Sequence, residues 1–439
     1  MRATRVDFAS VRLILSFLVS IPQFPQRPAM NISIPQHDIP VRNTCDVLVI
    51  GAGPAGVGAA LTAARAGARV TLVEYGGKLG GMWTLGLLTP YFDNRNKQGL
   101  NAEIRERLTE QGHWGGLWDI SFDPNAMAML LDELALDAKL DVLLYTIAAQ
   151  PIMEGDAIRG VIVHNKSGEQ AILASVVIDC TGDGDIAARA GAPFTVGRPN
   201  DGCFQPMTMM FRIGGLKDDY PRDNVLEFYR EICRHLPESE VLAKVPFNFP
   251  ALIRLPAPGE ALVQWTHIRR LSGTDGDELS QATFEGRRQV RSALELLKLA
   301  KPVVGDVHLL ELPSIIGVRE TRRVTGEYVV SDEDVRHGAS HPDGICRVTF
   351  GVDIHEPDEQ RQTNLANAGF DIPVRALVPL RVENLMTAGR CISGSYLAHA
   401  AYRVTGDCLA MGEGAARHAL AAIQAGKTVR QLAVHSQPR

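Results

Sequence analysis

The chain has 439 residues, of which 45% are hydrophobic and 22% charged, so it can bury a large core and form more than one domain. Its formal net charge of -5 provides no basic field, which argues against binding to nucleic acid or to an anionic membrane. The seven cysteines lack any Cys-x-x-Cys spacing, which argues against an iron–sulfur cluster, predicts no metal site and is typical of a reducing compartment such as the cytoplasm.

The chain is expected to begin with a flexible extension, residues 1–44. Within it, arginines precede an apolar run at residues 13–21 that has the length of a signal-peptide core and is too short to cross a membrane. Prolines follow where a cleavage site would need small residues, so we expect no stable membrane insertion. Two alternatives are open for this extension: a targeting segment, or extra residues ahead of a natural start at Met30.

The next element is a continuous apolar run at residues 47–50, typical of a parallel strand that is covered on both faces. It leads into the pattern Gly-x-Gly-x-x-Gly at Gly51, Gly53 and Gly56. The first glycine permits a tight turn, the second lets backbone amides approach a pyrophosphate, and the third allows a helix to pack closely on the strand. Strand and glycines together predict a dinucleotide site.

Two further elements complete this motif. Residues 54–66, which begin with Pro54 and Ala55, are nearly all small and predict a helix that lies flat on the sheet. A second strand at residues 69–74 ends in Glu74, close to the spacing of about 20 residues at which a carboxylate binds the ribose 2′-hydroxyl. We expect all three named residues to contact the dinucleotide, and the acidic residue excludes a 2′-phosphate.

The pattern beyond this motif alternates between helix and strand. Helices are expected at residues 101–110 and 124–139, the second with Asp123 as its N-cap. Alternating runs over residues 141–173 predict a small β-meander. A later helix at residues 282–301 carries arginines on a stripe that we expect to face solvent.

Three segments indicate a longer dinucleotide than a nicotinamide cofactor. Residues 76–82 are a second glycine-rich stretch, and residues 176–185 are another buried strand that breaks into glycine and aspartate. A late apolar run at residues 384–391 is followed by a small-residue helix at 405–422, which a nicotinamide site would not need. The residues in these segments that we expect to contact the cofactor are Gly80, Gly81, Met82, Thr181, Gly182, Gly389, Arg390, Gly406 and Asp407.

This order of elements resembles the FAD-dependent oxidoreductases of the glutathione-reductase-like superfamily and, more narrowly, the FAD module of heterodisulfide reductase. The resemblance covers residues 45–425. Beyond the nucleotide motifs it rests on the segments 205–212, 317–328, 353–355 and 389–393. It implies that the cofactor is FAD.

The resemblance also implies an α/β fold in two domains. A discontinuous Rossmann-like FAD-binding domain, with a parallel sheet and a small β-meander, would comprise residues 45–200 and 372–430. An inserted α+β domain, residues 201–371, would face the substrate, and residues 431–439 would form a tail. FAD would then lie at the interface of the two domains.

The helix at residues 405–422 is expected to support flavin chemistry. If its N-terminus faces the pyrimidine edge of the flavin, the positive end of the helix dipole stabilises negative charge there, and Asp407 lies beside the ribityl chain. The alternative is that Asp407 only caps the helix.

Three arginines in the substrate-facing segment are the strongest candidates for substrate binding. On a strand that leaves residues 315–316, Arg319 and Arg323 would share one face and Arg322 would lie on the other. A guanidinium suits a carboxylate or phosphate oxygen and can also hold a cofactor. The alternative is an internal salt-bridge network with the neighbouring glutamates. We expect one of these arginines to face the flavin.

Oxidation of a C–H bond also requires a base, for which histidine is the usual residue. The candidates are His267, His355 and His399, and His399 is favoured because it lies in the C-terminal FAD segment. Members of the family commonly have a histidine three positions earlier, where this sequence has Tyr396. We therefore expect His399, Arg319 and Arg323 to be catalytic.

The sequence thus predicts a cytoplasmic FAD-dependent oxidoreductase that transfers a hydride between a small organic substrate and the flavin. A homo-oligomer or an electron-acceptor protein is a possible partner. One alternative is an NAD-linked or thiazole-synthase-like use of the fold, in which the dinucleotide is a substrate. Another is a non-enzymatic electron relay. Cys203 and Cys391 have no neighbouring cysteine for disulfide chemistry, so we expect a packing role for Cys391.

Overall fold

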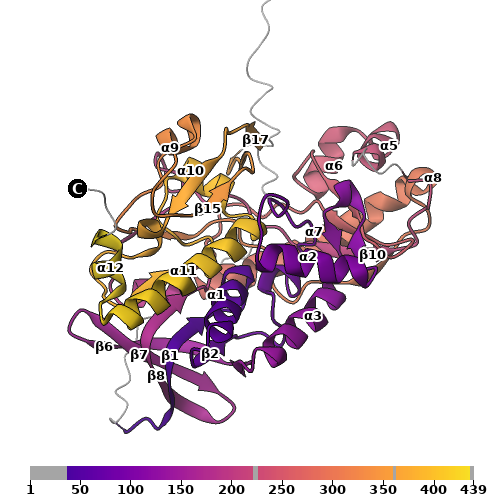
Figure 1. Ribbon diagram of the computed structural model, residues 1–439. Helices are drawn as coiled ribbons and strands as arrows, with labels where there is room; N and C mark the ends of the chain where they lie inside the picture. Colours follow the sequence, from indigo (N-terminus) through magenta and orange to yellow (C-terminus); the bar gives the residue numbers. More distant parts are fainter. Residues whose placement is uncertain (1–36, 221–225, 359–361, 436–439) are drawn as a thin grey trace, which may run out of the picture. The chain divides into compact units, whose positions relative to one another are not determined.

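Helices and strands alternate along the described chain, as the sequence pattern predicts. The computed structural model describes residues 37–220, 226–358 and 362–435. The predicted targeting segment and the alternative start at Met30 lie outside these residues. Residues from Ile39 onward form one unit (Figure 1), and none of the helices described in it is long and apolar enough to cross a bilayer.

A seven-stranded sheet is built around strand β1. Its order is β5-β2-β1-β8-β7-β6, with β19 also paired to β8. The pairs β5–β2, β2–β1, β1–β8 and β8–β19 are parallel, whereas β6, β7 and the first half of β8 form an antiparallel meander. The strands are β1 (Val41–Ile50), β2 (Val70–Val73), β5 (Asp141–Leu143), β6 (Ile147–Glu154), β7 (Ala157–Asn165), β8 (Gly168–Asp179) and β19 (Leu385–Thr387). Three strands far apart in sequence, β1, β8 and β19, therefore share one sheet, as the resemblance implies.

Helices α1 and α11 pack together on one face of this sheet (Figure 1). Small residues make this approach possible, because a Cβ at Gly412 would lie 1.9 Å from the carbonyl oxygen of Ala55. The helices of this half of the chain are α1 (Pro54–Arg65), α2 (Leu100–Glu110), α3 (Pro124–Asp137), α4 (Asp185–Arg189), α9 (Asp332–His337), α10 (Tyr396–Tyr402), α11 (Thr405–Ala425) and α12 (Val429–His435), with short 3-10 turns at Gly81–Trp83, Leu117–Asp119 and Val374–Leu377.

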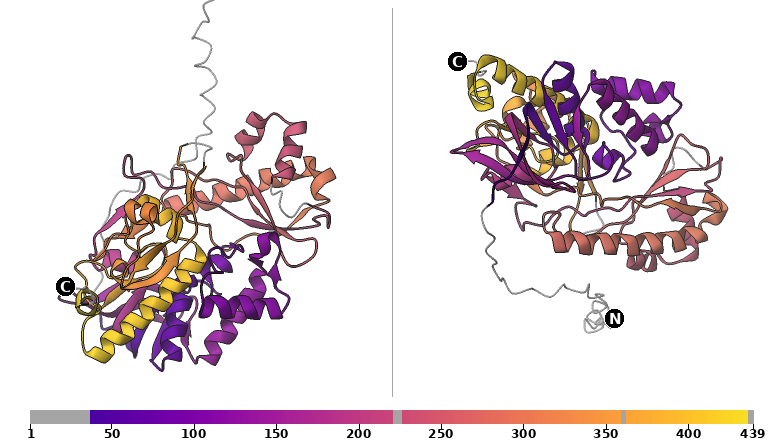
Figure 2. Two further views of the ribbon diagram at one scale, coloured as in Figure 1. Left: turned by 45° about the horizontal axis from the view of Figure 1, so that its top comes forward. Right: turned by 90° about the horizontal axis from the view of Figure 1, so that it is seen from below.

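A second, antiparallel sheet has the order β11-β12-β10-β13 and lies within residues 201–371. The long helix α7 packs against it and shares its apolar core (Figure 2). The elements are β10 (Phe211–Gly214), β11 (Ala251–Arg254), β12 (Ala261–Gln264), β13 (His308–Glu311), α5 (Glu227–His235), α6 (Glu238–Lys244), α7 (Gly276–Leu299) and α8 (Lys301–Val304). This is the α+β character expected of the inserted segment.

Four two-stranded sheets connect these parts. They are β3 (Trp114–Gly115) with β4 (Ser121–Phe122), β9 (Phe194–Val196) with β14 (Arg322–Val324), β15 (Gly344–Val348) with β18 (Phe370–Pro373), and β16 (Val352–His355) with β17 (Gln362–Leu365). Strand β14 carries two of the three predicted substrate arginines, and β16 carries a predicted histidine.

Local patterns predicted several elements correctly and placed others imprecisely. Asp123 caps α3 as expected, accepting hydrogen bonds from two backbone amides of its first turn. The strand at 141–143 was assigned to the meander, but it pairs in parallel with β2. The strand at 176–179 is the end of the longer β8. Helix α7 begins six residues before the predicted 282, because Asp275 caps it through the amide of Glu278.

Candidate functional site

The first glycine motif forms the tight turn that its spacing predicts. Gly51 has a φ of +91°, and a Cβ there would lie 2.6 Å from the carbonyl oxygen of Cys180. A Cβ at Gly56 would lie only 1.7 Å from the carbonyl oxygen of Gly51, so this glycine lets α1 pack against the strand. Gly53 differs, because nothing lies within 4 Å of the position of its Cβ. The backbone at Gly53 therefore borders open space.

Glu74 connects the two glycine-rich stretches. It lies buried after β2, and its carboxylate accepts hydrogen bonds from the amides of Ala52 and Gly76, both at 2.7 Å. Burial raises the pKa of Glu74, while the backbone hydrogen bonds oppose this shift. The structure thus holds the predicted ribose ligand at the edge of the glycine turn.

The second glycine stretch lies directly against the first. The amide of Gly80 donates to the carbonyl oxygen of Ala52 at 2.7 Å. Gly80 and Gly81 have φ values of +102° and +51°, and a Cβ at Gly81 would lie 2.8 Å from the Cα of Gly53. Both residues therefore need to be glycine, and residues 80–82 border the same open space as Gly53.

The late Gly389-Arg390 pair joins the same edge of the sheet. A Cβ at Gly389 would lie 3.2 Å from the Cβ of Ala55 in the first motif. Arg390 Nη2 pairs with Asp183 Oδ1 at 2.9 Å, directly beside Gly182. Arg390 Nη1 is buried and has no hydrogen-bond partner among the described residues. A buried donor without a partner is costly, so Arg390 is suited to an anionic or polar ligand.

Asp407 lies in the first turn of α11 and does not cap it. The N-cap position is Val404, and no side chain caps this helix. Instead, the buried Asp407 pairs with Lys97 Nζ at 2.7 Å, and Lys97 pairs with Asp93 at 2.9 Å. Burial raises the pKa of Asp407 well above its usual value, and Lys97 opposes that shift. Lys97 and Asp93 gave no sequence signal, because a lysine in a polar loop is normally exposed.

Arg319, Arg322 and Arg323 point to three different places. The predicted strand is wrong for Arg319, since β14 begins only at Arg322. Arg323 is buried and pairs with Glu320, and Arg322 pairs with Asp185 at 2.9 Å. The salt-bridge alternative therefore holds for these two residues.

Arg319 differs from its two neighbours in having only neutral partners. Its Nη1 donates to the carbonyl oxygen of Pro206 and to the hydroxyl of Thr208, both at 2.6 Å.

Two predicted histidines meet in the interior. His267 Nε2 and His355 Nδ1 are joined by a hydrogen bond of 2.9 Å, and His355 Nε2 lies 3.3 Å from Asp353 Oδ2. Arg403 donates to the Asp353 carbonyl oxygen at 2.7 Å. The His267 ring stacks on Phe247 with centroids 3.7 Å apart, and its Nδ1 is buried without a partner in the described residues.

His399 lies in α10, close to the start of α11. Its side chain is buried, and its Nδ1 has no hydrogen-bond partner among the described residues. Burial lowers the pKa of His399 well below its usual value, and the charges of Arg403, Arg323 and Arg390 lower it further. His399 is therefore a neutral imidazole surrounded by arginines. The hydroxyl of Tyr396 is also buried without a partner in the described residues.

Comparison with known proteins identifies this arrangement. A family model described as FAD dependent oxidoreductase matches residues 46–437. The chain belongs to this family. FAD is therefore the cofactor of the protein, and its role is enzymatic redox chemistry. The narrower likeness to the FAD module of heterodisulfide reductase stays a prediction.

Individual relatives match parts of this oxidoreductase. It is 32% identical to digeranylgeranylglycerophospholipid reductase of Methanoculleus marisnigri over 179 residues, which are 34% of this chain and 42% of that protein. It is 33% identical to thiamine thiazole synthase of Aeropyrum pernix over 162 residues, which are 33% of this chain and 57% of that protein. Less than two thirds of each relative is therefore spanned.

A solved structure shares the fold across most of the oxidoreductase. A geranylgeranyl bacteriochlorophyll reductase-like protein from Thermoplasma acidophilum aligns with a TM-score of 0.50 at 15% identity, covering 90% of this chain and 82% of that one. At this identity the likeness shows the fold alone. That fold is the α/β FAD-binding architecture predicted from the sequence.

The residues of the glycine edge fit FAD. Gly53 and Gly81 expose backbone beside open space, where a phosphate can approach amides without a side chain in the way. Arg390 Nη1 and Asp407 Oδ2 are buried atoms that lack partners among the described residues. A long dinucleotide offers phosphates and hydroxyls that could satisfy both kinds of group.

The histidine pair of this oxidoreductase predicts a dependence of stability on pH. Burial and the charge of Arg319 lower the pKa of His355 to about 4, although Asp353 opposes the shift. As the pH falls from about 6.5 to about 4, the unfolded chain binds a proton that the folded chain resists, so the free energy of unfolding falls by about 3 kcal/mol from this residue alone. Urea unfolding at several pH values measures this slope. His355→Gln should flatten it, and an unchanged slope would contradict the assignment.

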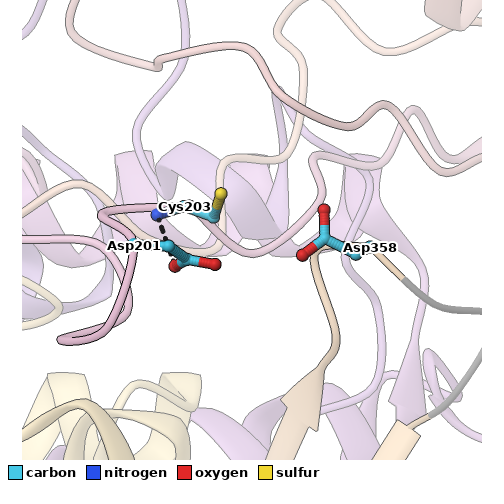
Figure 3. A group of neighbouring side chains, drawn as sticks. All are labelled: Asp201, Cys203 and Asp358. Carbon is cyan, nitrogen blue, oxygen red and sulfur yellow. Dashed lines mark hydrogen bonds between the residues drawn. The ribbon is translucent and has the colours of Figure 1, made fainter.

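One surface cluster has the geometry of a metal site. Asp201, Cys203 and Asp358 lie close together, as Figure 3 shows. However, Arg198 already pairs with Asp201 and with Asp358, the latter at 2.8 Å. The guanidinium neutralises both carboxylates, so the cluster is explained as a surface ion-pair network.

The thiols of the oxidoreductase fit packing roles better than redox roles. All seven cysteines are free. Cys391 is fully buried, and burial raises the pKa of its thiol well above the usual value. A protonated buried thiol is a poor nucleophile, which agrees with the expected packing role.

Proposed function

We propose that the protein binds FAD along the glycine edge and transfers a hydride between the flavin and a small organic substrate held by residues 201–371. The observation that most supports this proposal is the convergence of four distant segments, near residues 51, 81, 182 and 389, beside the open backbone of Gly53. Bound FAD supplies the hydride acceptor or donor. The protein supplies binding, orientation and proton transfer.

The proposed cofactor contacts are those predicted from the sequence. The first motif and Glu74 would hold the adenosine and pyrophosphate, and the later segments would hold the flavin half. The residues are Gly51, Gly53, Pro54, Ala55, Gly56, Glu74, Gly80, Gly81, Met82, Thr181, Gly182, Gly389, Arg390, Gly406 and Asp407. The N-terminus of α11 would contribute its positive dipole end.

The catalytic roles are proposed for Arg319, Arg323 and His399. Arg319 would bind substrate through nitrogens that protein atoms leave free. Arg323 pairs with Glu320 and lies over the Tyr396 ring, 5.8 Å from its centroid, so it would position that ring and its hydroxyl. His399 would accept a proton at Nδ1, because its ring is neutral and that nitrogen lacks a partner in the described residues.

The electron-relay alternative receives no support from the arginine cluster. A relay that docks a partner through this cluster would expose it. Instead, Arg323 and Glu320 are 4% and 1% exposed. The thiazole-synthase alternative has a specific observation in its favour, the 33% identity to the Aeropyrum enzyme, and it predicts a dinucleotide that is consumed.

Purified protein is expected to be yellow and to release FAD on heating, in an amount equal to the chain. Absorption in the flavin bands and chromatography of the released cofactor against FAD, FMN and NAD standards measure this. A colourless protein that takes up no added FAD would contradict the proposal. A colourless protein that releases an adenine nucleotide other than FAD would favour the thiazole-synthase alternative.

The setting of the reaction also belongs to the proposal. We propose a reducing compartment such as the cytoplasm, which the seven free thiols support. The electron acceptor or donor that regenerates the flavin would be a second small molecule or a protein partner. A homo-oligomer is compatible with this proposal, and gel filtration with light scattering tests it.

A further inference from the structure

Arg319 is an interior cation without an anionic partner. Its Nη1 donates to two neutral oxygens, those of Pro206 and Thr208. The described residues provide no hydrogen-bond partner for its Nε and Nη2, and no described carboxylate forms an ion pair with it. Arg322 and Arg323, by contrast, each pair with a carboxylate. Arg319 therefore keeps one edge of its guanidinium free.

The charges around Arg319 do not balance. Arg403 pairs with Asp353, which leaves the charge of Arg319 in excess. His267 and His355 do not change this sum, since burial and the charge of Arg319 lower the pKa of both rings and keep them neutral. Burial also lowers the pKa of Arg319 to about 9, still above neutrality, so it remains a cation. An uncompensated interior charge is costly unless a ligand neutralises it.

The free edge of Arg319 is accessible. Its two unpaired nitrogens are not among the fully buried unpaired atoms of the described residues, so they keep contact with solvent. Asp353 and Arg403 behave in the same way: burial is the largest influence on both pKa values, yet their side chains are 20% and 10% exposed. Residues that are deep and still partly exposed line an opening into the interior.

We infer that the substrate of the proposed oxidoreductase is an organic acid whose carboxylate binds the Nε and Nη2 edge of Arg319. A planar guanidinium edge matches the two oxygens of a carboxylate, and this geometry gives strong, charge-assisted hydrogen bonds. The bound carboxylate would also supply the negative charge that the cluster lacks. This inference rests on the proposed function and names its class of substrate.

The same chemistry could serve an anionic part of the cofactor, and the positions of the residues favour the substrate. The contacts of Arg319 come from Pro206 and Thr208, and its charged neighbours His267 and Asp353 belong to the same inserted segment. The glycine edge that fits the cofactor phosphates comes from other segments of the chain. The experiment below separates these two sources.

The test uses the FAD-loaded protein and isothermal titration calorimetry with acetate and benzoate as probes. Acetamide and benzamide serve as neutral probes of the same shape. At least one carboxylate is expected to bind, and its amide should bind at least about tenfold more weakly, because the charge-assisted pair is lost. If neither carboxylate binds, or if the amide binds equally well, the inference is overturned. This comparison requires no variant.

Two variants locate the binding site. Arg319→Gln should weaken carboxylate binding at least about tenfold while its FAD content stays equal to that of the wild type. Arg322→Gln is the matched control, since Arg322 pairs with Asp185, and it should bind as the wild type does. Arg319→Lys keeps the charge and should recover part of the affinity, which also covers the case in which the glutamine variant does not fold.

The other outcomes are equally informative. Wild-type carboxylate affinity in Arg319→Gln and Arg319→Lys would overturn the inference. Loss of FAD from a folded Arg319→Gln variant would assign Arg319 to the cofactor and overturn the inference, while the proposed function stands. A wild-type protein that takes up no FAD would instead defeat the proposed function itself.

Discussion

A Gly53→Leu variant is expected to fold as the wild type does and to lose more than about 90% of its bound FAD. The backbone of Gly53 has a φ of -66° and a ψ of -177°, which any residue adopts without strain. Nothing lies within 4 Å of its Cβ position, so the protein itself has room for a side chain. The leucine would fill space that we assign to the pyrophosphate. The ratio of flavin to protein absorbance measures FAD, and thermal unfolding reports the fold.

Two other glycines provide the controls for this variant. Gly276 also has nothing within 4 Å of its Cβ position, but it lies at the start of α7 and outside the glycine edge, so Gly276→Leu should retain FAD. Gly56→Ala should behave oppositely to Gly53→Leu, since its Cβ would lie 1.7 Å from a backbone oxygen and would destabilise the fold itself. Full FAD occupancy in Gly53→Leu would show that the pyrophosphate lies elsewhere.

The parts of the fold that the sequence predicted well depend on local signals. The turn at Gly51 and the close packing at Gly56 follow from residues a few positions apart, and so does the N-cap of α3 at Asp123. The sharing of one sheet by β1, β8 and β19 was also predicted, because the resemblance supplies the long-range topology that local patterns lack. The α/β class and the FAD cofactor followed from the same motifs.

The chemistry of the interior depends on long-range contacts and was harder to predict. Period-two alternation placed Arg319 and Arg323 on one strand face, but residues 318–321 are not in a strand. Gly317 forms only a single isolated bridge with Thr208. His267 and His355 were each predicted as candidate bases, yet their mutual hydrogen bond joins residues that are 88 positions apart. Nothing in either local sequence specifies that partner.

The buried Lys97 is a second feature without a local signal, and its removal should have a large effect on stability. Lys97→Met is expected to lower the free energy of unfolding by about 3–5 kcal/mol, because it leaves Asp93 and Asp407 buried without their cation. The side chains of Lys97 and Asp407 are 6% and 0% exposed, so solvent cannot compensate. Urea unfolding of FAD-free protein measures the change without a contribution from cofactor binding.

The pH dependence of this loss distinguishes charge from packing. Without Lys97, burial and mutual repulsion raise the pKa of Asp93 and Asp407 above the values in the unfolded chain, so the folded variant is relatively favoured at low pH and loses stability as the pH rises. The difference from the wild type should therefore be smaller at pH 5 than at pH 8. Lys97→Met combined with Asp407→Asn should recover part of the loss. Lys301→Met removes an exposed lysine paired with Asp306 and should change stability by less than about 0.5 kcal/mol. A loss that does not vary with pH would instead reflect the packing of the lysine stem, and the two carboxylates would then not depend on Lys97 for their charge.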